Sequence, residues 1–239
     1  MTIKMWNPTK SPFAPMEAKT DMQRAVLDRL EGIWRAYEES MRTVPLFQRL
    51  YADDGRQFTV ADYKALLLGL RPQVVEGSRW ISRTASSITI DWARSLFIGH
   101  ATEEHKDYTL LERDYVSVGG ALEEIQAAEK NAGGEALSGY IFNEALLPNP
   151  LHLLGGVFII EGTGDQLMGQ WGQQIQKVLG IEPKQTSFFT YHGGNDENHV
   201  KKMERMVMAP EMTEAMYKKL LKTASVIAAV YRLQYALMG

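Results

Sequence analysis

Metal-binding side chains recur at helical spacing near the end of the chain. Two of the five histidines bound the segment 192–199, with an aspartate between them. On a helix, the offsets of four and seven put His192, Asp196 and His199 on one face, one turn apart. Imidazole and carboxylate groups in this pattern can hold a metal ion, although a polar helix face beside a glycine pair can carry the same residues without one.

A second stripe of the same kind lies near the middle of the chain. On a helix predicted over 91–116, His100, Glu104 and Asp107 share a face at offsets of four and seven, whereas His105 points away from it. Among apolar neighbours such a stripe requires a cation, whereas a solvated charged face would need none.

Glu161 is the third candidate, since it directly follows the apolar residues 157–160. A carboxylate in such a context is either paired or a ligand, because burying it alone is very unfavourable. An ion pair with Arg83 or Arg94 is the alternative to metal binding. Together with the two stripes, Glu161 makes up to seven nitrogen and oxygen ligands, which suit two iron or manganese ions better than one structural zinc.

Several other chemistries are excluded or disfavoured by missing motifs. The chain has no cysteine, which excludes disulfides, thiolate metal sites, iron–sulfur clusters and cysteine nucleophiles. It has neither the Glu-x-x-His pairs of ferritin-like di-iron proteins nor the His-Glu-x-x-His pattern of zinc proteases. The isolated His152 is interpreted as a satisfied capping or core histidine.

Length and composition fit one folded unit. The chain has 239 residues, of which 45% are hydrophobic and 23% charged, and we expect a single domain over 1–239. A net charge of −3 without a basic tract argues against a nucleic-acid partner. The longest apolar stretch, 151–160, is far shorter than the ~20 residues that span a bilayer, and the first fifteen residues do not form a signal peptide. We therefore expect a cytoplasmic protein without a membrane partner.

The elements that must position these side chains are predicted to be helical throughout. Residues 1–18, with three prolines, indicate an extended N-terminal arm, and the pattern Thr59-Val-Ala-Asp62 indicates a helix cap. Apolar periodicity then predicts an all-α domain of about seven or eight helices. The stretches with a helical pattern are 21–41, 63–70, one opened by Pro72, 91–116, 121–130, 135–147, 151–179, the segment around 192–199, and 211–238.

The helix predicted over 151–179 is unusually rich in glycine. Each glycine inside a helix is unfavourable by roughly 1 kcal/mol relative to alanine. Their number therefore indicates close packing against a neighbour or local unwinding. The glycines in question are Gly155, Gly156, Gly162, Gly164, Gly169 and Gly172.

These residues resemble the haem-oxygenase-like di-iron oxidases. A late helix of that family carries His-x3-Asp-x2-His, as in 192–199, and a lone glutamate precedes it in an apolar, glycine-containing context, as Glu161 does. An earlier helix carries His-Ala-x-Glu-Glu-x-x-His, which 100–107 matches except that Asp107 replaces the last histidine. The similarity covers about half of the chain, residues 91–210.

The resemblance implies a haem-oxygenase-like bundle that binds two Fe(II) ions and uses O2 as co-substrate. Its metal ligands here would be His100, Glu104, Asp107, Glu161, His192, Asp196 and His199. Glu104, Asp107 and Glu161 would act as catalytic carboxylates that shift between the ions. The departure at Asp107 leaves open which of His100, Glu104 and Asp107 bind iron.

The family's substrates are fatty acids or molecules with an amine and a carboxylate, and we expect an amino-acid-like one here. The chain length and Asp107 are similar to the branch that forms nitriles from brominated tryptophan. An indole-sized pocket could be lined by Trp80, Phe158, Phe188 and Tyr191, although these aromatic residues fit a plain core as well.

Other proteins of the same fold and other functions remain as alternatives. Haem oxygenases need a histidine on the first helix, and none precedes His100. The thiamin-salvage hydrolases of this fold need a cysteine nucleophile, which is absent. A zinc- or manganese-dependent hydrolase with the same ligands and a non-enzymatic helical binding module stay open, and a homodimer is compatible with each function.

Overall fold

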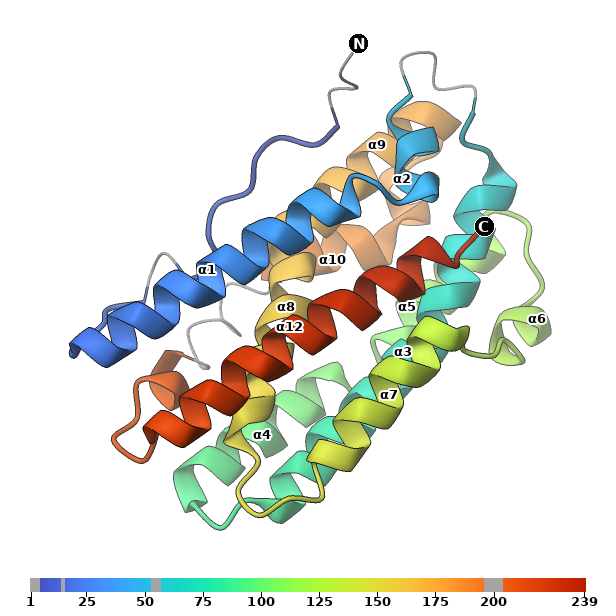
Figure 1. Cartoon of the computed structure of the whole chain (residues 1–239). Coiled ribbons are helices and arrows are strands. Elements are labelled where there is room, and N and C mark those ends of the chain that lie inside the picture. The colour runs from blue at the N-terminus through green and yellow to red at the C-terminus, as the bar shows by residue number, and fades with distance from the viewer. Residues whose placement is uncertain (1–4, 14–15, 53–56, 196–203) are drawn as a thin grey trace.

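The computed structural model describes the whole chain except residues 1–4, 14–15, 53–56 and 196–203 (Figure 1). Within the described part every regular element is a helix, so the all-α expectation is confirmed. This part holds more α-helices than the expected seven or eight. The first half contains α1 (Asp21–Met41), α2 (Pro45–Leu50), α3 (Val60–Ser87), α4 (Asp91–Glu104), α5 (Tyr108–Ser117) and α6 (Leu122–Gln126). The second half contains α7 (Ala132–Glu144), η1 (Leu151–Leu153), α8 (Leu154–Thr163), η2 (Gly164–Met168), α9 (Gly169–Leu179), η3 (Pro183–Gln185), α10 (Ser187–Asn195) and α12 (Glu214–Ala236).

The C-terminal helix α12 lies in the middle of one layer, between α1 and α7, and packs on α8 behind it (Figure 1). On the other side α3 packs against α4, α5 and α7. Large aromatic side chains fill the interior, among them Trp34 and Trp171, which are fully buried. Residues of α3, α4, α8, α10 and α12 line one cavity in this interior.

Helix α3 begins as predicted but does not end where predicted. Thr59 and Asp62 form a reciprocal capping box at its start. We expected a helix end near Leu70 and a new helix opened by Pro72, and this is wrong, because α3 continues through Pro72 to Ser87. A proline inside a helix removes one backbone hydrogen bond. Here apolar side chains on both sides of Pro72, from Leu66 to Trp80, are buried, and their packing offsets that loss.

The predicted single helix over 91–116 is wrong as well. Helix α4 ends at Glu104, and α5 starts at Tyr108 after a turn formed by 105–107. His100 and Glu104 consequently belong to one helix, whereas Asp107 sits at the N-cap position of the next. The side chain of Asp107 can therefore face different partners from those of His100 and Glu104.

The glycine-rich segment shows both features that its composition indicated. A Cβ on Gly155 would lie 2.1 Å from the backbone oxygen of Leu220 on α12, so α8 and α12 touch through their backbones. The helix also changes geometry at η2, a π-helix that directly follows α8. Such π-helical insertions in α-helices often mark functional sites.

The N-terminal arm lies on α1 without forming a helix of its own over 5–13. Trp6 and Phe13 are buried in the core, and Phe13 packs edge-on against Phe158 of α8. Thr9 donates hydrogen bonds to Glu38 of α1 through both its backbone nitrogen and its hydroxyl group. These contacts hold the arm in place at several points.

Candidate metal centre

Five of the predicted ligands converge in the interior from four helices. His100 and Glu104 come from α4, Asp107 from the start of α5, Glu161 from α8 and His192 from α10. Four of them, His100, Glu104, Glu161 and His192, line one cavity. The fifth, Asp107, contacts His192. Segments far apart in sequence thus supply one cluster of nitrogen and oxygen atoms, which we call the interior cluster.

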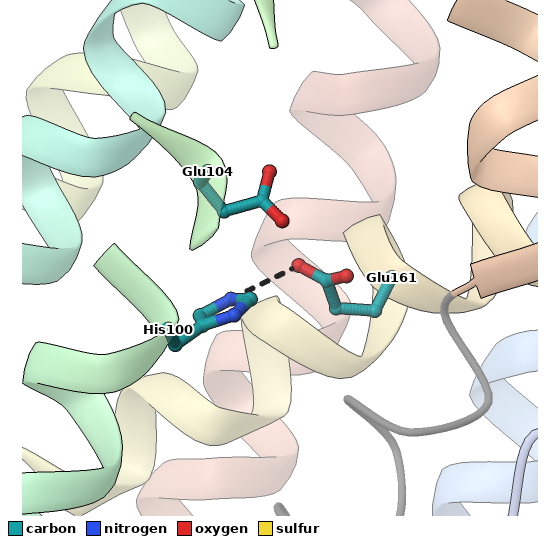
Figure 2. A group of neighbouring side chains, drawn as sticks. All are labelled: His100, Glu104 and Glu161. Atoms are coloured by element: carbon teal, nitrogen blue, oxygen red, sulfur yellow. Dashed lines mark ion pairs between the residues drawn. The ribbon is translucent and has the colours of Figure 1, made fainter. Parts of the chain in front are cut away.

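The part of the interior cluster formed by α4 and α8 is drawn in Figure 2. His100 Nε2 lies 3.2 Å from Glu161 Oε1, and Glu104 points toward the same place (Figure 2). One ligand atom from each of the three residues lies within 4.8 Å of the other two. Ligand atoms at roughly 2 Å from one ion lie at most about 4 Å apart, so small side-chain movements that bring the three groups closer would let them share a cation.

The other part of the interior cluster joins α5 to α10. His192 Nε2 lies 3.5 Å from Asp107 Oδ2. Asp196 and His199, predicted to extend this half of the site, lie outside the described residues. Both described residues are nearly inaccessible to solvent, at 7% exposure for His192 and 9% for Asp107. The turn between α4 and α5 allows this contact, because it frees Asp107 from the face that carries His100 and Glu104.

Electrostatics connect the two parts of the interior cluster. The pKa of the Glu104 carboxyl is raised to about 8, mainly by burial and next by the nearby charge of Glu161, while His100 and His192 act in the opposite direction. Asp107 adds a smaller upward effect. Three carboxylates with two imidazoles in a buried place repel one another unless protons or cations bind. The donor set therefore fits metal cations, and its oxygen and nitrogen ligands suit iron.

Of the four aromatic residues predicted to line a substrate pocket, two line the cavity and two do not. Trp80 and Phe188 line the cavity beside the interior cluster. Phe158 does not contribute to this wall, because it packs toward Phe13 on the N-terminal arm. Tyr191 is 45% exposed, since it lies one residue before His192 and hence about 100° around the helix.

The structure also shows whether His152 is a satisfied core histidine and whether Arg83 or Arg94 pairs with Glu161. His152 Nε2 lies 2.8 Å from Glu144 Oε2, so His152 is the satisfied core histidine that its isolation indicated. Arg94 pairs with Asp91 on its own helix, and Arg83 is exposed. Neither arginine takes the role of a buried partner for Glu161.

Asp114 was missed by the sequence analysis although it positions α10. This fully buried carboxylate of α5 accepts hydrogen bonds from the backbone nitrogens of Ser187, at 2.9 Å, and Phe188, at 3.0 Å. It also accepts one from the Ser187 hydroxyl group. Asp114 thereby caps the helix that carries His192. A signal was present, since Asp114 follows Asp107 by seven residues and shares its helix face.

Close backbone contact fixes the other end of α10. A Cβ on Gly193 would lie 2.5 Å from Cα of Gly169, where the π-helix η2 meets α9. Only glycine permits this approach. The helix carrying His192 is thus fixed by Asp114 at its start and by Gly193 beside the histidine.

Comparison with known families decides the broad class of this protein. A family model described as "iron-containing redox enzyme" matches residues 70–232, which is more than half of the chain. The chain belongs to this family. The matched span of this iron-containing redox enzyme includes all five residues of the interior cluster.

Solved structures show the fold. A protein of unknown function with a haem oxygenase-like fold from Shewanella denitrificans matches with a TM-score of 0.78 at 16% identity, covering 91% of each chain. A TenA homologue from Pseudomonas syringae matches with a TM-score of 0.69 at 11% identity over 98% of each chain. A TenA homologue from Pyrococcus furiosus gives 0.66 at 13%, covering 90% of this chain and 98% of its own. The haem-oxygenase-like fold expectation is thus confirmed.

No curated protein matches this chain. None of the helices described is long and apolar enough to cross a membrane.

Proposed function

We propose that this protein is a non-haem di-iron oxidoreductase that uses O2 and acts on an amino-acid-like substrate. The observation that carries the proposal is the interior cluster: three carboxylates and two histidines from four helices in a chain of an iron-containing redox family. His100, Glu104 and Glu161 would hold one iron ion. Asp107 and His192 would contribute to the second, together with Asp196 and His199.

When bound, the two ferrous ions would supply the electrons that reduce O2. The protein's own groups have other tasks. The carboxylates of Glu104, Asp107 and Glu161 balance the charge of the ions, and the imidazoles set how many coordination positions stay open. Apolar side chains of the cavity wall, among them Val157 and Ile160, exclude water from the reacting atoms.

The volume of the cavity limits the size of a substrate that can bind without side-chain movement. Its volume of about 50 Å³ holds a few water-sized molecules. A substrate as large as tryptophan therefore has to displace side chains that line the cavity. Met168 is the most adaptable of these, because its unbranched thioether chain has several rotatable bonds.

Within this class we propose halogenated tryptophan as the first substrate to test and a nitrile as the product to seek. The support for this finer proposal is the aspartate at position 107, where the di-iron oxidases that the chain resembles usually have histidine. Products would be identified by mass spectrometry after incubation of the iron-loaded protein with brominated tryptophan and O2.

The decisive experiment loads the protein with Fe(II) without air and then admits O2. We expect a transient visible absorption band and O2 uptake, both lost in His192→Ala. The matched control is His105→Ala, because His105 is exposed and lies between the two halves of the interior cluster without belonging to it.

Three outcomes would contradict the proposal in different ways. Iron binding without any O2 uptake would exclude the oxidase. Substrate turnover by the zinc or manganese form without O2 would identify a hydrolase. A protein that purifies without metal and is unaffected by chelators would be a helical binding module.

A further inference from the structure

One wall of the cavity carries a carboxamide that is not part of the interior cluster. Gln73 of α3 lines the cavity together with His100, Glu104, Glu161 and His192. It is only 4% exposed. Beside it, on α12, lies Gln234, which is fully buried.

The hydrogen bonds of this amide pair determine how Gln73 is oriented. Gln234 Nε2 donates to the backbone oxygen of Gly69 and to Oε1 of Gln73, each at 3.2 Å. A backbone carbonyl can only accept, so Gln234 must present its nitrogen there. Gln73 must then turn its oxygen toward Gln234, because two amide nitrogens would repel. The amino group of Gln73 is consequently directed away from Gln234.

This amino group is available to a ligand. No hydrogen bond from Gln73 Nε2 to another described residue is found, although the side chain is enclosed. Trp80, two turns later on the same helix, also lines the cavity, and its Nε1–H has no hydrogen-bond partner within the described ranges. Buried donors are rarely left without an acceptor in folded proteins. The wall formed by α3 thus lacks acceptors that a bound molecule could supply.

We propose that Gln73, oriented by Gln234, is the specificity-determining hydrogen-bond donor of this cavity. It selects substrates that present an oxygen acceptor to the wall formed by α3. This inference rests on the proposed function, in which the neighbouring interior cluster is the reacting centre. The residue acts in substrate binding and takes no part in the redox step.

The test compares two small probes on the ferrous protein without O2. Cyclopentanone and cyclopentane differ only in the carbonyl oxygen. Isotope-edited infrared difference spectra of carbonyl-labelled cyclopentanone report the hydrogen bond directly, because a donor lowers the frequency of the carbonyl stretch. We expect a bound carbonyl band in the wild-type protein that moves to higher frequency in Gln73→Leu.

Affinities provide the second measurement. Gln73→Leu should weaken cyclopentanone binding about tenfold, as expected for one lost hydrogen bond, and leave cyclopentane binding unchanged. Gln234→Leu should weaken it less, because Gln73 loses its orientation but keeps its donor. The matched control is Gln174→Leu, which removes a half-buried amide of α9 that donates to the Leu50 backbone oxygen away from the cavity.

Two results would overturn the inference. One is a carbonyl band with the same frequency in the wild type and in Gln73→Leu, and the other is a carbonyl band of the bound probe in the wild-type protein at the frequency that cyclopentanone shows in an apolar solvent. The second comparison needs only the wild-type protein, so it holds even where the variant fails to fold. Because O2 is absent throughout, either result leaves iron binding and O2 uptake standing. Conversely, a missing O2 reaction refutes the proposed function without altering the probe measurements.

Discussion

Two buried histidines of this chain contact glutamates, and their surroundings differ in charge. His152 Nε2 lies 2.8 Å from Glu144 Oε2, and His100 Nε2 lies 3.2 Å from Glu161 Oε1. In the first pair, one imidazole contacts one carboxylate. The second belongs to the interior cluster, in which carboxylates outnumber imidazoles. A buried His–Glu pair therefore does not by itself indicate a metal site, whereas a surplus of buried carboxylates does.

The largest expected effect is on the protein's iron affinity, which should depend on Glu161 and not on Glu144. Glu161→Gln removes a charged ligand, and we expect iron affinity to fall by more than about 100-fold, since even residues behind the ligands contribute ~10–100-fold. Glu144→Gln should leave iron affinity unchanged. Iron content after dialysis against a graded series of chelators measures both, and similar losses in the two variants would show that the comparison is wrong.

The second effect concerns the cap on α10. Asp114→Ala leaves two buried backbone N–H groups without acceptors, and we expect the free energy of unfolding to drop by about 3 kcal/mol. Iron affinity should drop too, because α10 carries His192. Denaturant unfolding and chelator competition measure these two quantities.

Asp114→Asn serves as the conservative control. It keeps one acceptor oxygen, so it should restore most of the stability and of the iron affinity. A purely structural role for Asp114 would appear as lost stability with unchanged iron affinity in Asp114→Ala.

A smaller effect is expected where α10 meets η2. Gly193→Ala would place a Cβ 2.5 Å from the Gly169 backbone, and overpacking of this kind destabilises by about 1–3 kcal/mol. The displaced helix should bind iron more weakly through His192. Gly139→Ala is the matched control, because a Cβ there meets nothing within 4 Å and alanine should stabilise α7 slightly. Equal melting temperatures for the two variants would contradict the close contact.

The smallest expected effect is a pH dependence of stability that comes from the pair of His152 and Glu144. Burial lowers the pKa of His152 below its usual value of 6.5, and the partly opposing effect of Glu144 does not restore it. A lowered pKa in the folded state means that protons bind more tightly to the unfolded chain. The stability from this group is therefore present above pH 6.5 and is lost as the pH falls below that value.

His152→Gln should reduce this loss. The measurement is the difference in melting temperature between the wild type and the variant from pH 7.5 to 5.5, with the same metal content. A difference that stays constant over this range would show that His152 titrates alike in both states.

Local sequence was sufficient for most of the helices and for the types of the metal-binding groups. The capping box of Thr59 and Asp62 and the long C-terminal helix were recognisable, because caps and apolar periodicity act over a few residues. The same local signals failed at Pro72 and at the turn 105–107. There, packing of distant helices outweighed what the neighbouring residues favoured.

Some features of the site have no local signal at all. The amino group of Gln73 is aimed by Gln234, which lies 161 residues later in the chain. The cap on α10 comes from Asp114, 73 residues before Ser187. Such contacts depend on how helices cross, and one sequence does not record that.

By itself, then, the sequence determined an all-α chain without cysteine that carries histidines and carboxylates on three separate segments, because residue type and helical period are local properties. Only the tertiary structure decided that His100, Glu104 and Glu161 meet within 4.8 Å, that Asp107 turns toward His192, and that glycines let the helices approach this closely. The physical reason is that a metal site needs several ligands within ångströms of one another, and such distances are set by the packing of the whole bundle.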